Sequence, residues 1–592
     1  MVGCTLYAPG HTLFFETMAM LSFVEYASEK RILELLVKER VKIALKGKLN
    51  NSSPTEIVRR VEDGSTLTIA EQMFMLMPPR DSWHKPTRRE RLTKDGVEKK
   101  SNKQILTRSI ALTIRLHRKS RANHPYLARL DEFIASLRGD VIAASPLQFT
   151  SMRVYGQKKK VAVDGTIIYR PICVFESLRE KLLVSLASKY LAEVFDPLLH
   201  EEILSYRPLR RYHNSEEAVI TNRDNAIENL QHYRQRHRRA YVAECDIQKY
   251  FDTINHDVIR ECISKFVQRI QAVEPDFDYS SVGRIVDAYL CSYSFYDNVL
   301  VENERLMREN PPKRFEAPKT ELFLARGCYD EQGFSASHDK IGIPQGGALS
   351  GLISNIVLNT VDHECGLDGN DPHKFFCRYS DDILLMHTSK EECQRLISLY
   401  CETLTKYKLL YHEFISVSDA EFRRKDNSVR SLLWDQKSRS PFLWGRSKDD
   451  AESVDWIGFL GYEIRYTGEV RLRRSSLNDK FKSVKSKYYN CVQSKLANGE
   501  LSYKTTEALT KRVEKRINRF AGKGFSEAKS LNSNKYLTTQ ALKLNRYTSR
   551  HLYRMLYKIA IRNNAIADLP SWWQYAKARG CMNYLRTINR CK

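Results

Sequence analysis

Two adjacent aspartates lie between two apolar runs in residues 375–386, FFCRYSDDILLM. Each run is long enough for a buried strand, so the segment predicts a β-hairpin with Asp381 and Asp382 at its tip. Two carboxylates at the end of buried strands repel each other and lose hydration, which is costly unless a cation neutralises them. The segment therefore predicts a fold built around a hairpin that offers a cation site.

Two further segments point to the same chemistry. Residues 241–254 (YVAECDIQKYFDTI) are typical of an apolar strand that ends at Asp246, with Phe251 five positions later. Residues 341–355 (IGIPQGGALSGLISN) are typical of a Gly-rich turn that leads into an apolar helix. Nucleotidyl transfer uses two divalent cations about 3.5–4 Å apart, and Mg²⁺ prefers carboxylate and phosphate oxygens. Asp246 and Asp381 would supply such ligands.

The predicted site then has three carboxylates, with Asp382 as the third, and Mg²⁺ as the expected ion, Mn²⁺ being the alternative. Each segment has an ordinary explanation when taken alone, because acidic turns are commonly solvated and Gly-rich turns commonly begin helices. The specificity lies in the ordered set, which runs from a basic hairpin through the Asp246 segment to PQGG at 344–347, YSDD at 379–382 and FLGY at 459–462.

The basic hairpin is predicted from β-rich runs within residues 158–172, on either side of Asp164-Gly165. Asp-Gly is typical of a two-residue type I′ turn, because both of its central positions need positive φ. Such a turn would pair Lys159 with Arg170 and gather cationic side chains. An amphipathic helix is predicted next, with an apolar face at Leu178, Leu182, Leu183, Leu186 and Leu191.

Residues 155–462, about half of the chain, resemble the reverse transcriptases of bacteria, the group that includes group II intron, retron and defence-associated enzymes. The segments that carry the resemblance are RPI at 170–172, the extended SYRP at 205–208, DIQKYFD at 246–252, PQGG at 344–347, YSDD at 379–382 and FLGY at 459–462. The resemblance implies an α+β right-hand polymerase fold with fingers, palm and helical thumb. It implies RNA-directed DNA polymerase activity, with an RNA template, nascent DNA and dNTPs as partners.

The resemblance also implies roles for single residues. Asp246, Asp381 and Asp382 would be catalytic and would bind metal, and the backbone carbonyl of Ile247 would add a ligand. Ser380 stands where alanine is common in the family, a change expected to be harmless.

On the substrate side, Arg170 and a lysine of the 158–160 run, Lys159 or Lys160, would contact the incoming triphosphate. Gln345 would contact the nucleotide and the template strand. Phe251 would exclude the ribose 2′-hydroxyl, which leaves its neighbour Tyr250 to the core. The FLGY segment would be the primer grip.

Four domains are expected. They are a helical N-terminal extension (1–140), fingers (141–240), a palm (241–470) with irregular insertions near 275–340 and 421–455, and a basic helical thumb (471–592). The extension is predicted from apolar helical spacing at 31–45 and 105–116.

Charge is unevenly placed along the chain, whose net charge is +25. Residues 465–592 hold 29 Lys and Arg against 7 Asp and Glu, with aromatic residues interleaved. A basic block of this kind is the usual footprint of nucleic-acid binding. The 13 cysteines include no Cys-x-x-Cys pair, and no secretory signal or apolar membrane span is recognisable, so a cytoplasmic protein with reduced thiols is expected.

Three functions remain open at this point. The first is an active reverse transcriptase in anti-phage defence, with a cognate non-coding RNA and a second copy of the chain as further candidate partners. The alternative is a group II intron-encoded maturase that assists RNA splicing and mobility, although no Cys/His endonuclease module follows the thumb. The third is an RNA-binding protein without catalysis, which the intact Asp246, Asp381 and Asp382 disfavour.

Overall fold

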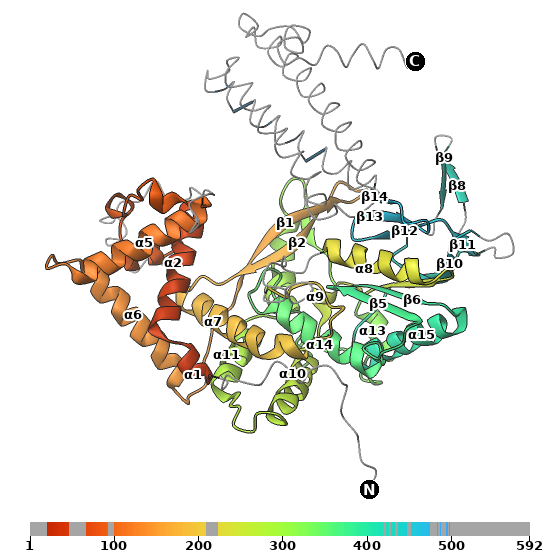
Figure 1. Cartoon of the computed structure of the whole chain (residues 1–592), viewed down its shortest axis with the longest axis horizontal. Coiled ribbons are helices and arrows are strands. Elements are labelled where there is room, and N and C mark those ends of the chain that lie inside the picture. Colours follow the sequence, from red (N-terminus) through yellow and green to blue (C-terminus); the bar gives the residue numbers. More distant parts are fainter. Residues whose placement is uncertain are drawn as a thin grey trace, which may run out of the picture.

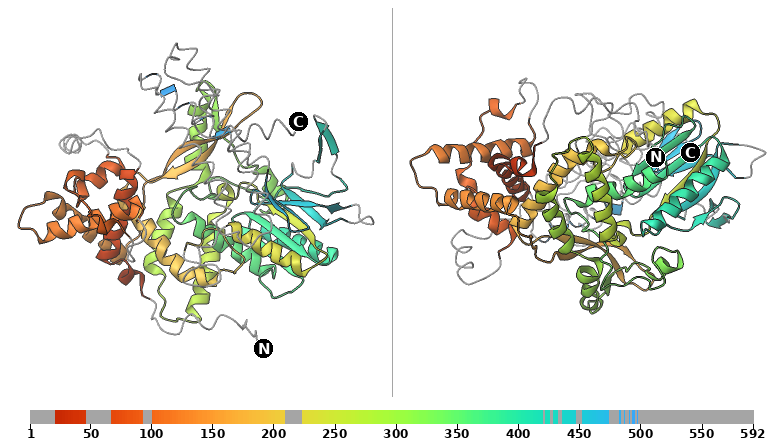
Figure 2. Two further views of the ribbon diagram at one scale, coloured as in Figure 1. Left: turned by 45° about the horizontal axis from the view of Figure 1, so that its top comes forward. Right: turned by 90° about the horizontal axis from the view of Figure 1, so that it is seen from below.

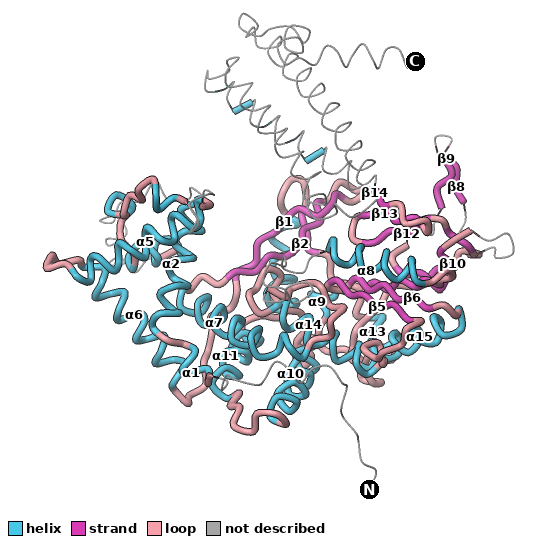
Figure 3. Tube along the Cα trace, in the orientation of Figure 1, coloured by secondary structure: helices cyan, strands magenta, loops and turns pink. Residues whose placement is uncertain are grey.

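The computed structural model describes residues 21–45, 67–92, 100–208, 223–419, 422–425, 428–431, 436–446 and 452–473, with scattered helical residues between 482 and 497. The predicted thumb, 471–592, therefore lies almost wholly outside the described residues. The described part combines a helical group, a projecting hairpin and a central sheet (Figures 1 and 3). Within these ranges, no helix combines the length and apolar character that crossing a membrane requires.

The described residues between 23 and 142 form a group of helices, as predicted. These are α1 (Phe23–Tyr26), α2 (Glu29–Leu45), α4 (Ile69–Leu76), α5 (Asn102–Lys119) and α6 (Pro125–Ile142), with short 3-10 turns at Arg80–Ser82 and Arg89–Arg91. Ser22, Thr68 and Ser101 each begin a helix with a capping box, which satisfies two backbone donors of the first turn. The group lies at one side of the molecule (Figure 1), where α2 packs against α7 (Leu178–Phe195).

The predicted basic hairpin is present as β1 (Arg153–Val161) and β2 (Ile167–Val174). A third strand, β4 (Lys313–Phe315), pairs in parallel with β2. In Figure 1 the hairpin projects from the body of the molecule between the N-terminal helices and the central sheet.

The turn and the register of this hairpin differ from the prediction. Gly165 has a φ of 86°, but Asp164 keeps a negative φ and accepts the N–H two residues on with its carboxylate, at 2.9 Å. Only one residue is therefore left-handed, the loop is longer than two residues, and Arg170 pairs with Gln157 instead of Lys159. Lys159 lies at an irregularity in the strand.

The central sheet has the strand order β11-β10-β3-β6-β5, and β7 also pairs with β10. Its strands are β3 (Tyr241–Asp246), β5 (Lys374–Tyr379), β6 (Asp382–His387), β7 (Phe414–Ile415), β10 (Ser438–Trp444) and β11 (Ser453–Val454). Successive residues of a strand point to opposite faces of the sheet, so β3 contributes side chains to a hydrophobic core on each face. Tyr241, Ala243 and Cys245 join the large core that includes α15 (Lys390–Lys406), whereas Val242 joins a smaller core with α8 (Arg223–Arg236). Figure 2 shows the sheet from two further sides.

Where the structure describes them, the two segments expected to be irregular contain regular helices and strands. Residues 275–340 contain α11 (Ser280–Cys291), a π-helix (Phe295–Val299), a 3-10 turn (Leu300–Glu302), α12 (Asn303–Met307), β4 and α13 (Glu321–Ala325). The 421–455 stretch contains β8 (Phe422–Lys425), β9 (Ser428–Ser431), β10 and β11. Prolines and charges suggested loops, but the buried apolar face of α11 and the pairing of β10 with β3 outweigh those local signals.

The remaining elements surround the sheet. They are a 3-10 turn (Asp196–Leu198), α9 (Tyr250–Thr253), α10 (His256–Gln271), α14 (Ser350–Glu364), and a small sheet of β12 (Trp456–Phe459), β13 (Tyr462–Arg465) and β14 (Val470–Leu472).

The SYRP segment is not wholly extended, because Tyr206 has a φ of 54°. A Cβ at Gly351 in α14 would lie 2.8 Å from the ring of Tyr206, so the helix approaches this ring only because it has glycine there.

Candidate active site

Three carboxylates meet where two paired strands end. β3 ends at Asp246, which pairs directly with Asp382, the first residue of β6. Asp381 precedes it in the turn between β5 and β6, after Ser380 with a φ of 63°. The antiparallel register therefore brings together acidic residues that are far apart in the sequence, and the predicted hairpin with its acidic tip is present.

The carboxylates disfavour one another's charge. Partial burial and the nearby charge of Asp246 raise the pKa of Asp381. Asp382 retains exposed surface, yet the surrounding protein and the two other carboxylates raise its pKa to about 7. Such mutual repulsion is relieved when a cation binds.

Two cationic or titratable groups lie beside Asp246. The Lys437 ammonium contacts its carboxylate, and the Nε2 atom of His412 lies 3.6 Å from the same oxygen. Burial and the neighbouring Lys437 lower the pKa of His412 to about 4, so this imidazole is neutral at pH 7. Lys437 is therefore the resident positive charge of the cluster.

The donor set can be compared with what a divalent cation needs. Among the described residues, no group of three or more Asp, Glu, His or Cys side chains is arranged to hold a metal ion. Mg²⁺, however, usually takes only one or two carboxylates and completes its shell with substrate phosphates and water. Asp246, Asp381 and Asp382 fit that requirement, and the buried Ile247, whose backbone carbonyl is the further predicted ligand, directly follows Asp246.

A buried network of hydrogen bonds holds the backbone at the tip of the β5–β6 hairpin. Arg378 of β5 is completely buried and donates from Nε to Asp362 at 2.8 Å and from Nη1 to the Asn355 side chain at 3.3 Å. Its Nη1 also lies 3.4 Å from the Ser380 carbonyl oxygen, and the Ser380 N–H donates to the Ser205 hydroxyl at 2.6 Å. The left-handed residue beside the aspartates is thus held from two sides.

Gln345, one of the predicted nucleotide-contacting residues, contacts the buried Asp252. Gln345 donates from Nε2 to the Asp252 carboxylate at 2.8 Å. Burial raises the pKa of Asp252 to about 6, although the positive charges of Lys249, Lys159 and Arg170 oppose that rise. The PQGG turn therefore contacts Asp252, and the charges of Lys159 and Arg170 on the hairpin act on the same carboxylate, even though the predicted Lys159–Arg170 pairing is absent.

Lys159 and Lys160, the predicted triphosphate contacts of β1, both lie near Glu316 of the 275–340 segment. Lys160 lies 3.0 Å from Glu316, and Lys159 lies 3.5 Å from the same side chain. Both lysines remain partly exposed. Glu316 thus holds the two ammonium groups of β1 near Lys249, which donates to the Ala317 carbonyl at 2.5 Å.

Two adjacent aromatic residues have different environments. Tyr250 is buried, as expected, and donates its hydroxyl to the Ser354 carbonyl at 2.8 Å. Phe251 is only half-buried, lines a pocket, and lies edge-on to the ring of Tyr206 at 6.3 Å. The position of Phe251 is compatible with the predicted gate, whose role remains a prediction.

The FLGY segment forms the turn between β12 and β13. Leu460 and Gly461 both have positive φ, at 49° and 87°, as a two-residue hairpin turn requires. Phe459 and Tyr462 are buried in the smaller core together with Leu384 and Met386 of β6. The turn is therefore joined to the back of the catalytic hairpin, and its role as a primer grip remains a prediction.

Sequence reasoning missed Arg378, Asp252 and Lys437 as parts of the site. An arginine inside the apolar run FFCRY was a usable signal, because a charge in a buried strand needs a partner. Lys437 carried no such signal, since it lies in the segment expected to be irregular.

One family of known proteins matches part of this chain. Residues 293–413 match the family model described as reverse transcriptase (RNA-dependent DNA polymerase). The matched stretch includes the PQGG turn and the hairpin with Asp381 and Asp382, and it begins after Asp246. No curated protein sequence matches the chain.

Solved structures similar to this chain include two telomerases. Apo telomerase from Candida tropicalis has 13% identity and a TM-score of 0.32, over 94% of this chain and 88% of that one. Telomerase from Candida albicans in complex with a TWJ fragment of telomeric RNA has 14% identity and a TM-score of 0.30, over 76% and 68%. At such TM-scores these likenesses contribute nothing to the functional argument.

Proposed function

We propose that the chain is an RNA-directed DNA polymerase that extends a primer at Asp246, Asp381 and Asp382, because residues 293–413 match the reverse transcriptase family model. The observation that carries this proposal is the pairing of Asp246 with Asp382. That pairing joins an aspartate outside the matched family segment to the two aspartates inside it. The three carboxylates would hold divalent cations, with Mg²⁺ as the proposed ion and Mn²⁺ as the alternative.

Bound there, two such cations would activate the primer 3′-hydroxyl and stabilise the leaving pyrophosphate. The protein's own part is to hold the carboxylates in place, which the paired strands and the Arg378 network do. Lys159, Lys160 and Arg170 would contact the triphosphate, since cationic groups on a hairpin suit a polyanion. Gln345, already oriented by Asp252, would contact the nucleotide and the template.

The test is primer extension on an RNA template by full-length Asp246→Asn and Asp381→Asn variants. Both should lose DNA synthesis while they retain RNA affinity, because the carboxylates serve the cations and not the template. Asp276→Asn is the matched control, since this aspartate is exposed on a loop before α11. Near-normal extension by either site variant would refute the assignment.

For the biological role, we propose anti-phage defence. The support is an analogy with stand-alone defence-associated enzymes, because the helical N-terminal group lies outside the matched segment. Cells that carry the gene with its native flanking sequence should form fewer plaques with some phages, and the Asp381→Asn version should not protect. Equal plaque counts across a broad panel would favour the group II intron maturase instead.

Further proposals concern partners and location. We propose a cytoplasmic protein that binds a cognate non-coding RNA as template and forms a homo-oligomer. Sequencing the nucleic acid that co-purifies with the protein tests the first partner, and light scattering on the purified protein tests the second. A mixture of unrelated RNAs would contradict a cognate template.

A further inference from the structure

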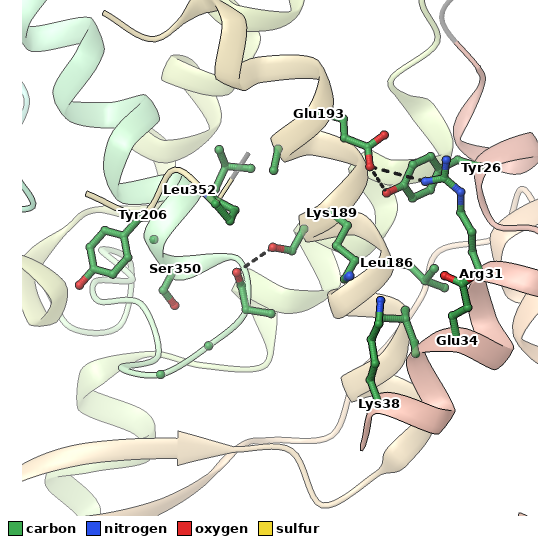
Figure 4. Close-up of a pocket in the computed structure, with 18 of the residues that line it drawn as sticks. Tyr26, Arg31, Glu34, Lys38, Leu186, Lys189, Glu193, Tyr206, Ser350 and Leu352 are labelled. Atoms are coloured by element: carbon green, nitrogen blue, oxygen red, sulfur yellow. Dashed lines mark hydrogen bonds and ion pairs between the residues drawn. The ribbon is translucent and has the colours of Figure 1, made fainter. Parts of the chain in front are cut away.

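A pocket of about 690 Å³ lies between the N-terminal helices and the candidate active site. Figure 4 shows its walls, which come from α2, α7 and the loop that leads into α14. One end is lined by Phe251 and by Gly346 and Gly347 of the PQGG turn, and the other end by residues of α2. The pocket therefore reaches Phe251 and the PQGG turn, which were both predicted to act on the nucleotide.

The walls of this pocket are fixed by contacts between distant segments. Glu193 of α7 accepts the Tyr26 hydroxyl at 2.7 Å and pairs with Arg31 of α2 at 3.6 Å. Arg31 also stacks over the Tyr26 ring. On the opposite side, the Ser188 hydroxyl donates to the Ala348 carbonyl at 2.8 Å, which ties α7 to the PQGG loop. The charge of Arg31 is therefore already matched within the protein.

Two lysines in the lining, unlike Arg31, form no ion pair with a described residue. Lys38 of α2 and Lys189 of α7 both line the pocket, and in Figure 4 their ammonium groups point toward the same space. Within the described ranges, neither forms an ion pair or a hydrogen bond. Partial burial and then the nearby charge of Lys38 lower the pKa of Lys189, so the two ammonium groups repel each other. Glu193 and Glu34, which also line the pocket, oppose this shift and raise the pKa of Lys189.

The opposite end offers a different kind of contact. Tyr206 is 52% exposed at the pocket wall, beside Phe251, so its ring is accessible to a stacked base. Gly346 has a φ of 90° and is exposed, which presents the backbone of the turn without a side chain. Paired cations at one end and an accessible aromatic ring at the other are the combination that single-stranded nucleic acid uses.

We propose that this pocket binds the unpaired RNA template ahead of the active site, with its phosphates between Lys38 and Lys189. The N-terminal helices then have a role in polymerisation, because α2 supplies half of the cationic pair. This inference rests on the proposed polymerase function. Both lysines lie outside the segment that matches the family model.

The test compares primer–templates whose 5′ template overhang is either one or eight nucleotides long. Wild-type protein should bind the long overhang more tightly, and a full-length Lys38→Gln/Lys189→Gln variant should lose that gain, by about tenfold at low salt. The dependence of log affinity on log salt should become shallower by about 1.4 for the long overhang only, or about 0.7 for each lost phosphate contact. Lys30→Gln, an exposed lysine on α2 outside the pocket, is the matched control.

A second measurement needs no variant. RNA templates with 4-thiouridine within the overhang should form photo-crosslinks to peptides of α2 and α7. Equal affinity of wild type for both overhangs, an unchanged gain in the double variant, or crosslinks only to other segments would each overturn the inference. In those cases wild-type protein would still extend a primer on the template with the one-nucleotide overhang. If wild-type protein extended no primer on either template, the proposed polymerase function itself would be refuted.

Discussion

At the scale of single residues, the site depends on a buried ion pair that solvent does not reach. Arg378 and Asp362 are both completely inaccessible to solvent and pair at 2.8 Å. Removing one partner of a buried pair leaves an uncompensated charge, which typically costs about 3–5 kcal/mol, whereas removing both can be nearly neutral. Arg378 is thus a positioning residue whose effects on stability and on activity can be separated.

We expect Arg378→Met to lower the free energy of unfolding by about 3–5 kcal/mol. The double variant Arg378→Met/Asp362→Leu should recover most of that stability but keep a lower kcat, because the Ser380 carbonyl and the Asn355 side chain still lack their donor. Denaturant unfolding and primer extension check the two parts. A double variant with wild-type kcat would show that the network is only structural.

The second residue-scale prediction concerns the choice of nucleotide. Phe251→Ala should admit ribonucleotides while deoxynucleotides are still used, because a bulky ring excludes the 2′-hydroxyl by steric clash. Phe251→Tyr, which keeps the ring, is the matched control. The measurement is the ratio of kcat/KM for the two nucleotide classes on one primer–template. If the ratio stays the same in the alanine variant, the gate lies elsewhere.

At the scale of elements, the loop before the PQGG turn is attached to the start of α10. The buried His256 contacts the Gly342 carbonyl through Nε2 at 2.7 Å, and the Gly342 N–H donates to the Ile254 carbonyl at 2.7 Å. Burial lowers the pKa of His256 to about 4. A neutral imidazole can donate to the carbonyl and needs no charged partner, so this contact holds the loop at neutral pH.

This arrangement predicts a pH dependence of stability. The folded-state pKa of His256 lies below the value of about 6.5 of an unfolded chain, so the unfolded state binds more protons between these values. The stability contributed at pH 7 should be lost as the pH falls from about 6.5 toward 4, by up to about 3 kcal/mol. His256→Gln should weaken the loop at pH 7 but flatten this slope. Parallel slopes of unfolding free energy against pH for both proteins would contradict the prediction.

At the scale of the whole molecule, the chain is expected to separate catalysis from duplex binding. The carboxylates lie in the central sheet, whereas most of the net positive charge lies in residues 465–592. Phosphate contacts release counterions, so a basic region dominates the salt dependence of nucleic-acid affinity.

We therefore expect a chain that ends at Leu472 to bind a primer–template more weakly and with a shallower dependence on salt. Fluorescence anisotropy at several salt concentrations measures both quantities. The Lys38→Gln/Lys189→Gln variant provides a comparison, because it should alter the salt dependence only for long overhangs. Equal affinity and equal salt dependence in the shortened chain would mean that the basic block is an ordinary solvated surface.

The local amino-acid pattern was sufficient to predict those elements whose characteristic residues lie close together in the sequence. The apolar runs around Asp381 and Asp382 predicted their hairpin, and the leucine spacing predicted α7. The same reasoning failed for the Asp164-Gly165 turn, because the Asp164 side chain satisfied a backbone donor in a longer loop. It also failed for β10, whose pairing with β3 outweighs its polar flanks.

The amino-acid sequence by itself determined which groups are available: three aspartates at strand ends, a glycine turn, and a basic C-terminal block. Periodicity and turn chemistry act over a few residues, so these features can be recognised without a structure. Tertiary structure alone decided that Asp246 pairs with Asp382, that Arg378 supports Ser380, and that Lys38 and Lys189 line the same pocket. Each of these contacts depends on how strands and helices pack, and electrostatic effects at short range follow from that packing.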